Sequence, residues 1–249
     1  EPCDVNEVID KIDLFQQDPE VLDRELNGLI KKLTTGFFQL ECDDKKIHIA
    51  SVFYTLSKVC NVKKTYIHLD ANVYLLKHIE NAVRTYDSME LSTPVSSKIL
   101  KWHYLYLAFC WLCVIVKAPL KLSDDSHLLQ FIDDSITKHE KVTVLQPLFA
   151  EIKAELLVKN RILLHKFCEL LHETTNDENV IDYFEMLLIY RILKAIVKSP
   201  KQFSIYRDDV GLIELLSWIC LYQSDRLLSL ERGAILMTKI FPKLLPFFI

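Results

Sequence analysis

The sequence predicts an all-α chain, and three observations lead to that prediction. The 249 residues are 50% hydrophobic, which is enough to bury a sizeable core. They include only 4 glycines, where average usage would give roughly 17. Hairpin turns and phosphate-binding loops need glycine for a positive φ or a close backbone approach, so both are disfavoured. Apolar residues recur at helical spacing, and no convincing run of alternating strand residues occurs.

The expected helices pair into antiparallel hairpins. These lie near residues 19–60, 72–117, 125–158, 160–197 and 209–241. Their rough period of about 40 to 48 residues is close to the period of HEAT and armadillo repeats, which is about 40 to 47 residues. The sequence therefore predicts an all-α, HEAT/armadillo-like helical-repeat solenoid of about five helical hairpins. An irregular helical bundle is the alternative.

Each helix is placed by a start signal or by one apolar face. Asp18-Pro19 puts a capping residue before a proline, which is typical of a helix start, and this helix should run to about Leu33. Thr93-Pro94 should open the helix that carries the most apolar stretch of the chain. Helical spacing predicts the others near residues 46–60, 72–86, 125–138, 144–158, 160–174, 178–197, 209–222 and 224–241.

The most apolar stretch runs from Trp102 to Val116 and contains one plainly polar residue, His103. A membrane-spanning helix needs about 20 apolar residues to cross roughly 30 Å. This run of about 15 residues covers only about 22 Å at the rise of an α-helix. No membrane span is therefore expected. The stretch is instead predicted to be a helix buried on nearly all sides.

Two cysteines in this stretch, Cys110 and Cys113, have the spacing of a CxxC motif. Redox CxxC motifs lie at helix N-termini, where the helix dipole lowers a thiol pKa, and zinc sites need a second pair of ligands. Neither condition is met within this apolar helix. We interpret both cysteines as small packing residues.

Composition disfavours several function classes. The net charge is −4 and the basic runs are pairs, so nucleic acid is not an expected partner. The 7 cysteines are odd in number and mostly lie in apolar helical patterns, which suits reduced thiols in the cytosol. No catalytic motif such as G-x-S-x-G is present. We expect a protein that is not an enzyme and needs no cofactor.

The best metal candidate consists of His165, Cys168 and His172, which share one helix face, with Glu169 nearby. One straight helix rarely supplies three tetrahedral ligands, because these positions spread over about 10 Å of its axis. Cys168 also shares a stripe with apolar neighbours. We therefore predict no metal site, and an all-α enzyme with a His/Cys metal site is the least favoured hypothesis.

Three stretches, in matching order and spacing, resemble the tubulin-folding cofactor D family. The first is Phe15–Asp23, which is similar to the family's Gln-x-x-Pro-x-Leu-Leu-Asp. The second lies within Val52–Leu69 and matches at Lys58, Val59, Lys64, Thr65, Tyr66, Ile67, His68 and Leu69. The third matches at Trp102, Tyr104, Leu105, Leu107, Trp111, Leu112 and Pro119.

The chain also departs from the family pattern. A glycine of the family's loop is replaced by Cys60-Asn61-Val62, although Asn61 can still take a positive φ. Ser123-Asp124-Asp125 stands where polar-Leu-Asp-Gly is more typical. The match is clearest over residues 14–120, and we expect a diverged, fungal member of the family.

The resemblance implies a noncatalytic tubulin chaperone built of HEAT or armadillo-like repeats. Its implied partners are β-tubulin, the αβ-tubulin heterodimer, tubulin cofactors C and E, and an Arf-like small GTPase. Its implied location is the cytoplasm, in association with the cytoskeleton. An unrelated HEAT or armadillo scaffold, such as a transport or trafficking adaptor, is the alternative function.

Four lysines are the candidate partner-binding residues: Lys45, Lys46, Lys63 and Lys64. They lie at expected helix ends or loops, and they could face an acidic client such as tubulin. Ordinary solvated loop charge is the competing interpretation.

We expect residues 1–249 to be one α-solenoid segment from the N-terminal part of a longer repeat protein. The family's chain is longer, and the apolar tail from Phe241 to Ile249 lacks the polar outer face that a terminal repeat needs.

Overall fold

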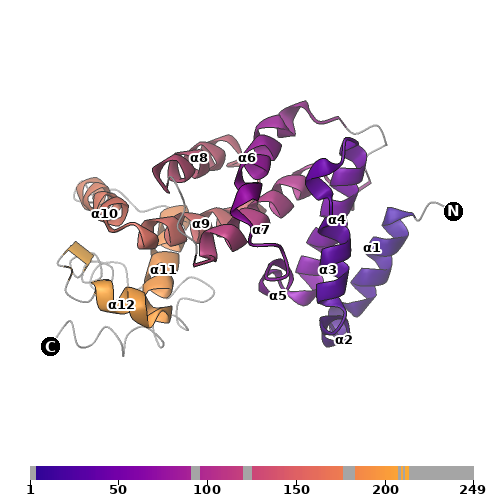
Figure 1. Cartoon of the computed structure of the whole chain (residues 1–249), viewed down its shortest axis with the longest axis horizontal. Coiled ribbons are helices and arrows are strands. Elements are labelled where there is room, and N and C mark those ends of the chain that lie inside the picture. Colours follow the sequence, from indigo (N-terminus) through magenta and orange to yellow (C-terminus); the bar gives the residue numbers. More distant parts are fainter. Residues whose placement is uncertain are drawn as a thin grey trace. The chain divides into compact units, whose positions relative to one another are not determined.

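The computed structural model describes residues 4–90, 96–119, 125–175, 183–206, 209, 211 and 212. Within these residues it contains α-helices, short 3-10 helices and no strand, so the predicted all-α class is confirmed (Figure 1). The chain divides into two compact units, Glu1–Leu122 (unit 1) and Ser123–Ile249 (unit 2). A single solenoid segment over residues 1–249 stays a prediction.

Unit 1 contains seven described α-helices joined by short 3-10 helices and loops. The α-helices are α1 (Val5–Asp13), α2 (Glu20–Asp23), α3 (Leu26–Thr34), α4 (Asp43–Cys60), α5 (Val62–Tyr66), α6 (Leu76–Thr85) and α7 (Trp102–Lys117). The 3-10 helices are η1 (Leu14–Gln17), η2 (Phe37–Gln39), η3 (Val73–Leu75) and η4 (Tyr86–Ser88).

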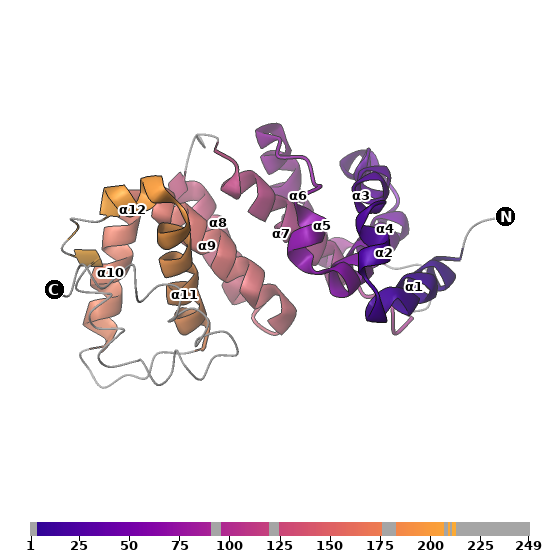
Figure 2. The ribbon, with the colours of Figure 1, turned by 90° about the horizontal axis from the view of Figure 1, so that it is seen from below.

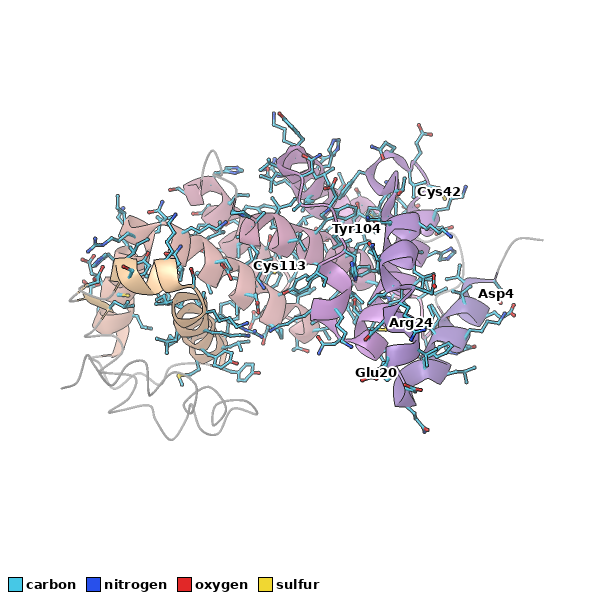
Figure 3. All side chains as sticks on the ribbon, turned by 60° about the horizontal axis from the view of Figure 1, so that its bottom comes forward. Asp4, Glu20, Arg24, Cys42, Tyr104 and Cys113 are labelled. Carbon is cyan, nitrogen blue, oxygen red and sulfur yellow. The ribbon has the colours of Figure 1, made fainter. Side chains whose placement is uncertain are left out.

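Helix α7 forms the centre of unit 1, because 13 of its 16 residues are buried. It packs against α4, α5 and α6, and Phe37 and Phe38 of η2 also contact it. Figure 3 shows Tyr104 and Cys113 of α7 among packed helices, whereas Asp4 and Glu20 lie at the periphery of unit 1. The helix begins at Trp102 and not at Thr93-Pro94, which lies outside the described residues.

The CxxC cysteines lie in the middle of this buried helix. Cys110 and Cys113 are both completely buried, and burial raises the pKa of the Cys110 thiol well above its ordinary value. A thiol must lose its proton to act as a nucleophile or a metal ligand. Their interpretation as packing residues is confirmed.

Helix α4 is the second central helix and contacts α1, α2, α3, α5 and α7 (Figure 2). It buries Ser51, Thr55 and Ser57, whose hydroxyls each donate a hydrogen bond to the carbonyl four residues back, over 2.8 to 2.9 Å. These bonds satisfy polar groups that would otherwise be costly to bury.

The predicted helix from Asp18 to about Leu33 is interrupted. It consists of α2 and α3, with a turn at Arg24 and Glu25 between them. At this turn the Glu25 amide donates to the Leu22 carbonyl, three residues back, and the i−4 pattern resumes at Leu29. The tighter turn lets Leu26 point into the core, where it is 1% exposed.

Unit 2 is built around α9 (Gln146–Lys159), which contacts α8 (Asp125–Lys138), α10 (Arg161–Thr175) and α11 (Tyr183–Lys198) (Figures 1 and 2). Helix α12 (Pro200–Tyr206) packs on α11, and η5 (Thr143–Leu145) precedes α9.

The hairpins near 19–60, 72–117 and 125–158 each contain a pair of packed helices, as predicted. In the fourth hairpin, α11 packs chiefly on α9, since its buried Ile189, Ile192 and Ile196 share a core cluster with Ala154. An ion pair between Arg191 of α11 and Glu151 of α9, 2.5 Å long, adds to this contact. The fifth hairpin, near 209–241, lies almost wholly outside the described residues.

In the part of the chain that the structure describes, no helix has both the length and the apolar character that crossing a membrane requires.

His103 is the buried polar group of α7, with 3% of its surface exposed. Its ring stacks on Tyr54, with centroids 4.4 Å apart, and its Nδ1 lies 2.9 Å from the Ser51 hydroxyl. Burial lowers the pKa of His103 to about 4. The folded chain therefore holds a neutral histidine at neutral pH.

We predict an acid-dependent loss of stability through His103. The unfolded chain binds a proton here below about pH 6.5 while the folded chain does not, so the free energy of unfolding should fall by up to about 3 kcal/mol between pH 6.5 and pH 4. Urea unfolding of the wild type and of His103→Asn, followed by tryptophan fluorescence, measures this contribution. His48→Asn on α4 is the matched control. An equal pH dependence in the wild type and in His103→Asn would contradict the prediction.

Candidate functional site

A hollow of about 610 Å³ opens in unit 1 beside the C-terminal end of α3. One wall comes from α3 and the turn after it, and the other from the loop between α5 and η3. Its floor includes the buried side chains of Phe37 and Trp111, while Lys31, Ile67 and Asp70 lie on its exposed rim. It therefore combines a buried aromatic floor with a rim open to solvent.

Gly36 makes the turn at the first wall possible. Its φ of +73° lies in the left-handed region, which other residues rarely adopt, and α3 has ended just before it. The Gln39 amide donates to the Gly36 carbonyl over 3.0 Å, which closes the turn that forms η2. This turn directs Phe37 inward and leaves Phe38 half-buried at the hollow.

The aromatic floor is a cluster of rings in contact. Phe37 lies between Tyr104 and Trp111, with centroids 5.8 Å and 6.2 Å away. Phe38 contacts Trp111 at 4.9 Å and stacks on His78 at 5.8 Å. Aromatic pairs at such distances stabilise one another beyond the area that they bury.

The second wall is held by two hydrogen bonds from α7. The Trp111 indole donates to the Asp70 carbonyl over 2.9 Å, and Lys117 donates to the Tyr66 hydroxyl over 2.8 Å. The Lys117 ammonium also lies 5.1 Å from the centre of the Tyr66 ring, within cation–π range. The loop before η3 is thus anchored at Asp70, and the end of α5 from which it starts is anchored at Tyr66.

The turn from α4 into α5 has the geometry that the sequence allowed. Asn61 has a φ of +82°, as anticipated, and its side chain accepts a hydrogen bond from the Lys63 amide over 2.9 Å. The Ser57 and Thr65 hydroxyls lie 2.9 Å apart in the core beneath this turn. Asn61 therefore both takes the positive φ of this turn and caps the start of α5.

Two of the three stretches that resemble the family line the hollow, and the first stretch contacts the second outside it. Lys64 of the second stretch donates to Asp23 of the first over 2.6 Å. The third stretch supplies Trp111, and the loop that its indole anchors contains Ile67 and His68 of the second. Residues far apart in the sequence thus form one local structure.

The rim carries two charges of opposite sign. Lys31 on α3 and Asp70 on the loop before η3 are both exposed, and neither has an ion-pair partner among the residues that the structure describes. Sequence reasoning missed this hollow. A possible signal was the run Gly36-Phe37-Phe38, because a glycine followed by two aromatic residues is unusual for a purely solvated turn.

The four candidate lysines do not form one patch. Lys45 and Lys46 lie in the first turn of α4, and Lys63 and Lys64 lie in α5, after its far end. A helix of 18 residues extends about 27 Å, so the two pairs are well separated.

The four lysines also differ in their partners. Lys46 pairs with Asp43 at 3.3 Å and Lys64 pairs with Asp23 at 2.6 Å. The hydrogen bond to Asp23 raises the pKa of Lys64 above its ordinary value. Lys45 and Lys63 have no ion-pair partner in the described ranges, so their charges are available to an outside partner.

A second polar cluster lies in unit 2, where Asp209 is 1% exposed at its side chain. One carboxylate oxygen lies 2.7 Å from His165 Nε2 and 3.0 Å from Arg161 Nε. Burial tends to raise the pKa of Asp209, but the hydrogen bonds from His165 and the Leu212 amide, with the charges of His165 and Arg161, lower it overall.

In this cluster His165 binds Asp209, and not the other residues of the predicted metal candidate. Cys168 lies in the core cluster of unit 2, and burial raises the pKa of its thiol to about 12, which opposes thiolate formation. The side chain of His172 lies outside the described residues. No group of three or more His, Cys, Asp or Glu side chains suited to a metal ion occurs within the residues that are described.

Comparison with known proteins gives a family match. The family model described as "Tubulin-specific chaperone D-like, ARM repeat" matches residues 12–172, which include all of α2 to α9 and most of α10. The predicted class of HEAT/armadillo-like helical repeats is thereby confirmed. No curated protein and no solved structure matches the chain.

We predict that Trp111→Phe loosens the second wall of the hollow. The substitution removes the indole N–H that binds the Asp70 carbonyl, which should cost about 1 kcal/mol in addition to the packing that is lost. Hydrogen exchange at residues 67–71 should therefore become faster. Trp102→Phe on the same helix removes the same atoms at a site away from this loop and is the control. Unchanged exchange at 67–71 in Trp111→Phe would show that the indole does not anchor the wall.

Proposed function

This chain belongs to the tubulin-specific chaperone D-like ARM-repeat family, and on that premise we propose that it is a noncatalytic tubulin chaperone segment. It helps to capture β-tubulin and to assemble or dissociate the αβ-tubulin heterodimer. It does so together with tubulin cofactors C and E and an Arf-like small GTPase. The observation that carries the proposal is the family match over residues 12–172.

The chemistry of the described residues supports a binding role. Large apolar side chains are exposed on unit 1, including Leu14 (80%), Val21 (55%) and Tyr74 (86%), and such residues on a soluble surface can contact a protein client. The cysteines of the described residues are all free, which suits the reducing cytoplasm in which we place the chaperone, in association with the cytoskeleton.

Binding of purified αβ-tubulin to the purified chain tests the proposal. The two proteins should form a complex that sediments as one species at micromolar concentrations, and the Arf-like GTPase is tested in a parallel arm. The physical basis is a repeat surface that holds a large client through many weak contacts. Sedimentation of the chain as a separate species from both tubulin and the GTPase would contradict the function.

We predict that charge reversal at Lys63 or at Lys45 weakens tubulin capture. Lys45 is exposed and Lys63 is half-buried, and neither has an ion pair within the described part of unit 1, so Lys63→Glu or Lys45→Glu should remove an attraction without breaking an ion pair. An exposed charge contributes about 0.2 to 1 kcal/mol, so binding should weaken by about two- to tenfold for a reversal. Titration of labelled tubulin at two salt concentrations measures the effect.

The exposed Lys141, in unit 2, gives the control variant Lys141→Glu. Lys46→Glu and Lys64→Glu are less informative, because they also break the ion pairs with Asp43 and Asp23. If Lys45→Glu, Lys63→Glu and Lys141→Glu all bind tubulin as tightly as the wild type, these lysines are ordinary solvated charges.

A further inference from the structure

We propose that the hollow of unit 1 is a docking site for a segment of a protein partner that carries a bulky apolar side chain between an acidic and a basic residue. The inference rests on the proposed function, because tubulin serves as the probe of the site. The hollow is lined by none of the four candidate lysines, Lys45, Lys46, Lys63 and Lys64.

The shape of the hollow suits a bulky side chain. Its volume of about 610 Å³ is within the range of about 300 to 1,000 Å³ that is usual for sites of small ligands. The floor is apolar and buried, with Trp111 4% exposed, while most of the rim is open to solvent. An open rim around an apolar floor fits a side chain that enters from a neighbouring protein surface.

An exposed apolar residue marks the edge at which the partner would enter. Ile67 lines the hollow, yet 61% of its surface is exposed. Phe38 on the opposite wall is only half-buried. An apolar side chain placed between them would remove the apolar surface of both from water, which is the main driving force for association.

The charges on the rim indicate which charged residues the partner's segment would carry. Lys31 is the single lysine or arginine among the residues that line the hollow, and Asp70 is the single acidic residue. They come from opposite walls, and both lack an ion pair among the described residues. A segment with an acidic residue near Lys31 and a basic residue near Asp70 complements both charges.

The same two charges argue against other classes of partner. A nucleic acid or an anionic membrane surface would meet one lysine and be repelled by Asp70. The exposed side chains of Asn27 and Gln39 add hydrogen-bonding groups to the rim, as at the edge of a protein interface.

The hollow is formed before any partner binds. The Trp111 indole holds the loop with Asp70, and the turn at Gly36 holds Phe37 and Phe38 against α7. A preformed site loses little conformational freedom on binding, which favours affinity. These contacts place the walls independently of any partner.

The test uses the whole chain, purified αβ-tubulin as the probe, and three variants of the rim. Ile67→Asp should weaken binding by about tenfold or more, because it puts a charge at the apolar edge. Lys31→Glu and Asp70→Lys should each weaken binding by roughly three- to tenfold, because each breaks one charge pair.

Two exposed positions outside the hollow give matched controls. Lys32→Glu reverses the charge next to Lys31, and Ile162→Asp in unit 2 places a charge at an apolar residue that is 69% exposed. Both should bind within about twofold of the wild type. Thermal melting checks that every variant folds, and Ile67→Ser replaces Ile67→Asp if the latter does not.

Each outcome decides between the hypotheses. If the wild type binds tubulin and the Ile67 variant binds equally well, the docking site is wrong while the proposed function stands. If Lys31→Glu and Asp70→Lys change affinity in opposite directions, the partner carries one sign of charge and the mixed-charge segment is wrong. If the wild type binds no tubulin, the proposed function fails, and the docking site that rests on it fails too.

Discussion

The structure of unit 1 depends on the burial of α7 on nearly every side. An apolar helix of this kind cannot face water, so α4, α5 and α6 must pack around it. The few polar groups on α7 must then find partners inside the unit. His103 forms a hydrogen bond with Ser51 on α4, and the Trp111 indole donates one to the carbonyl of Asp70. Each of these bonds ties a neighbouring segment to the central helix.

The hollow is a consequence of the same constraint. Trp111 belongs to the core helix and is nearly buried, yet it also forms part of the hollow's floor. Its hydrogen bond places the loop before η3 on one side, and its contact with Phe38 places the turn after α3 on the other. The packing that stabilises unit 1 therefore also shapes the surface at which we propose that a partner docks.

Periodicity and side-chain chemistry predicted those features that depend on local sequence. The buried α7, the inert cysteines within it and the positive φ of Asn61 follow from apolar pattern, helix position and the tolerance of asparagine for that backbone region. The break between α2 and α3 was missed, because no glycine or proline marks it. The hollow was also missed, because it arises from long-range packing that no single stretch encodes.

The most direct test of the account is hydrogen exchange of the whole chain with and without saturating αβ-tubulin. The account predicts slower exchange on binding at residues 34–39 and 67–71, the two walls of the hollow, with little change at the solvent-facing start of α1. The walls bury their exposed rim when a segment docks, so their amides should become protected. Formation of the tubulin complex with unchanged exchange at both walls would contradict the account.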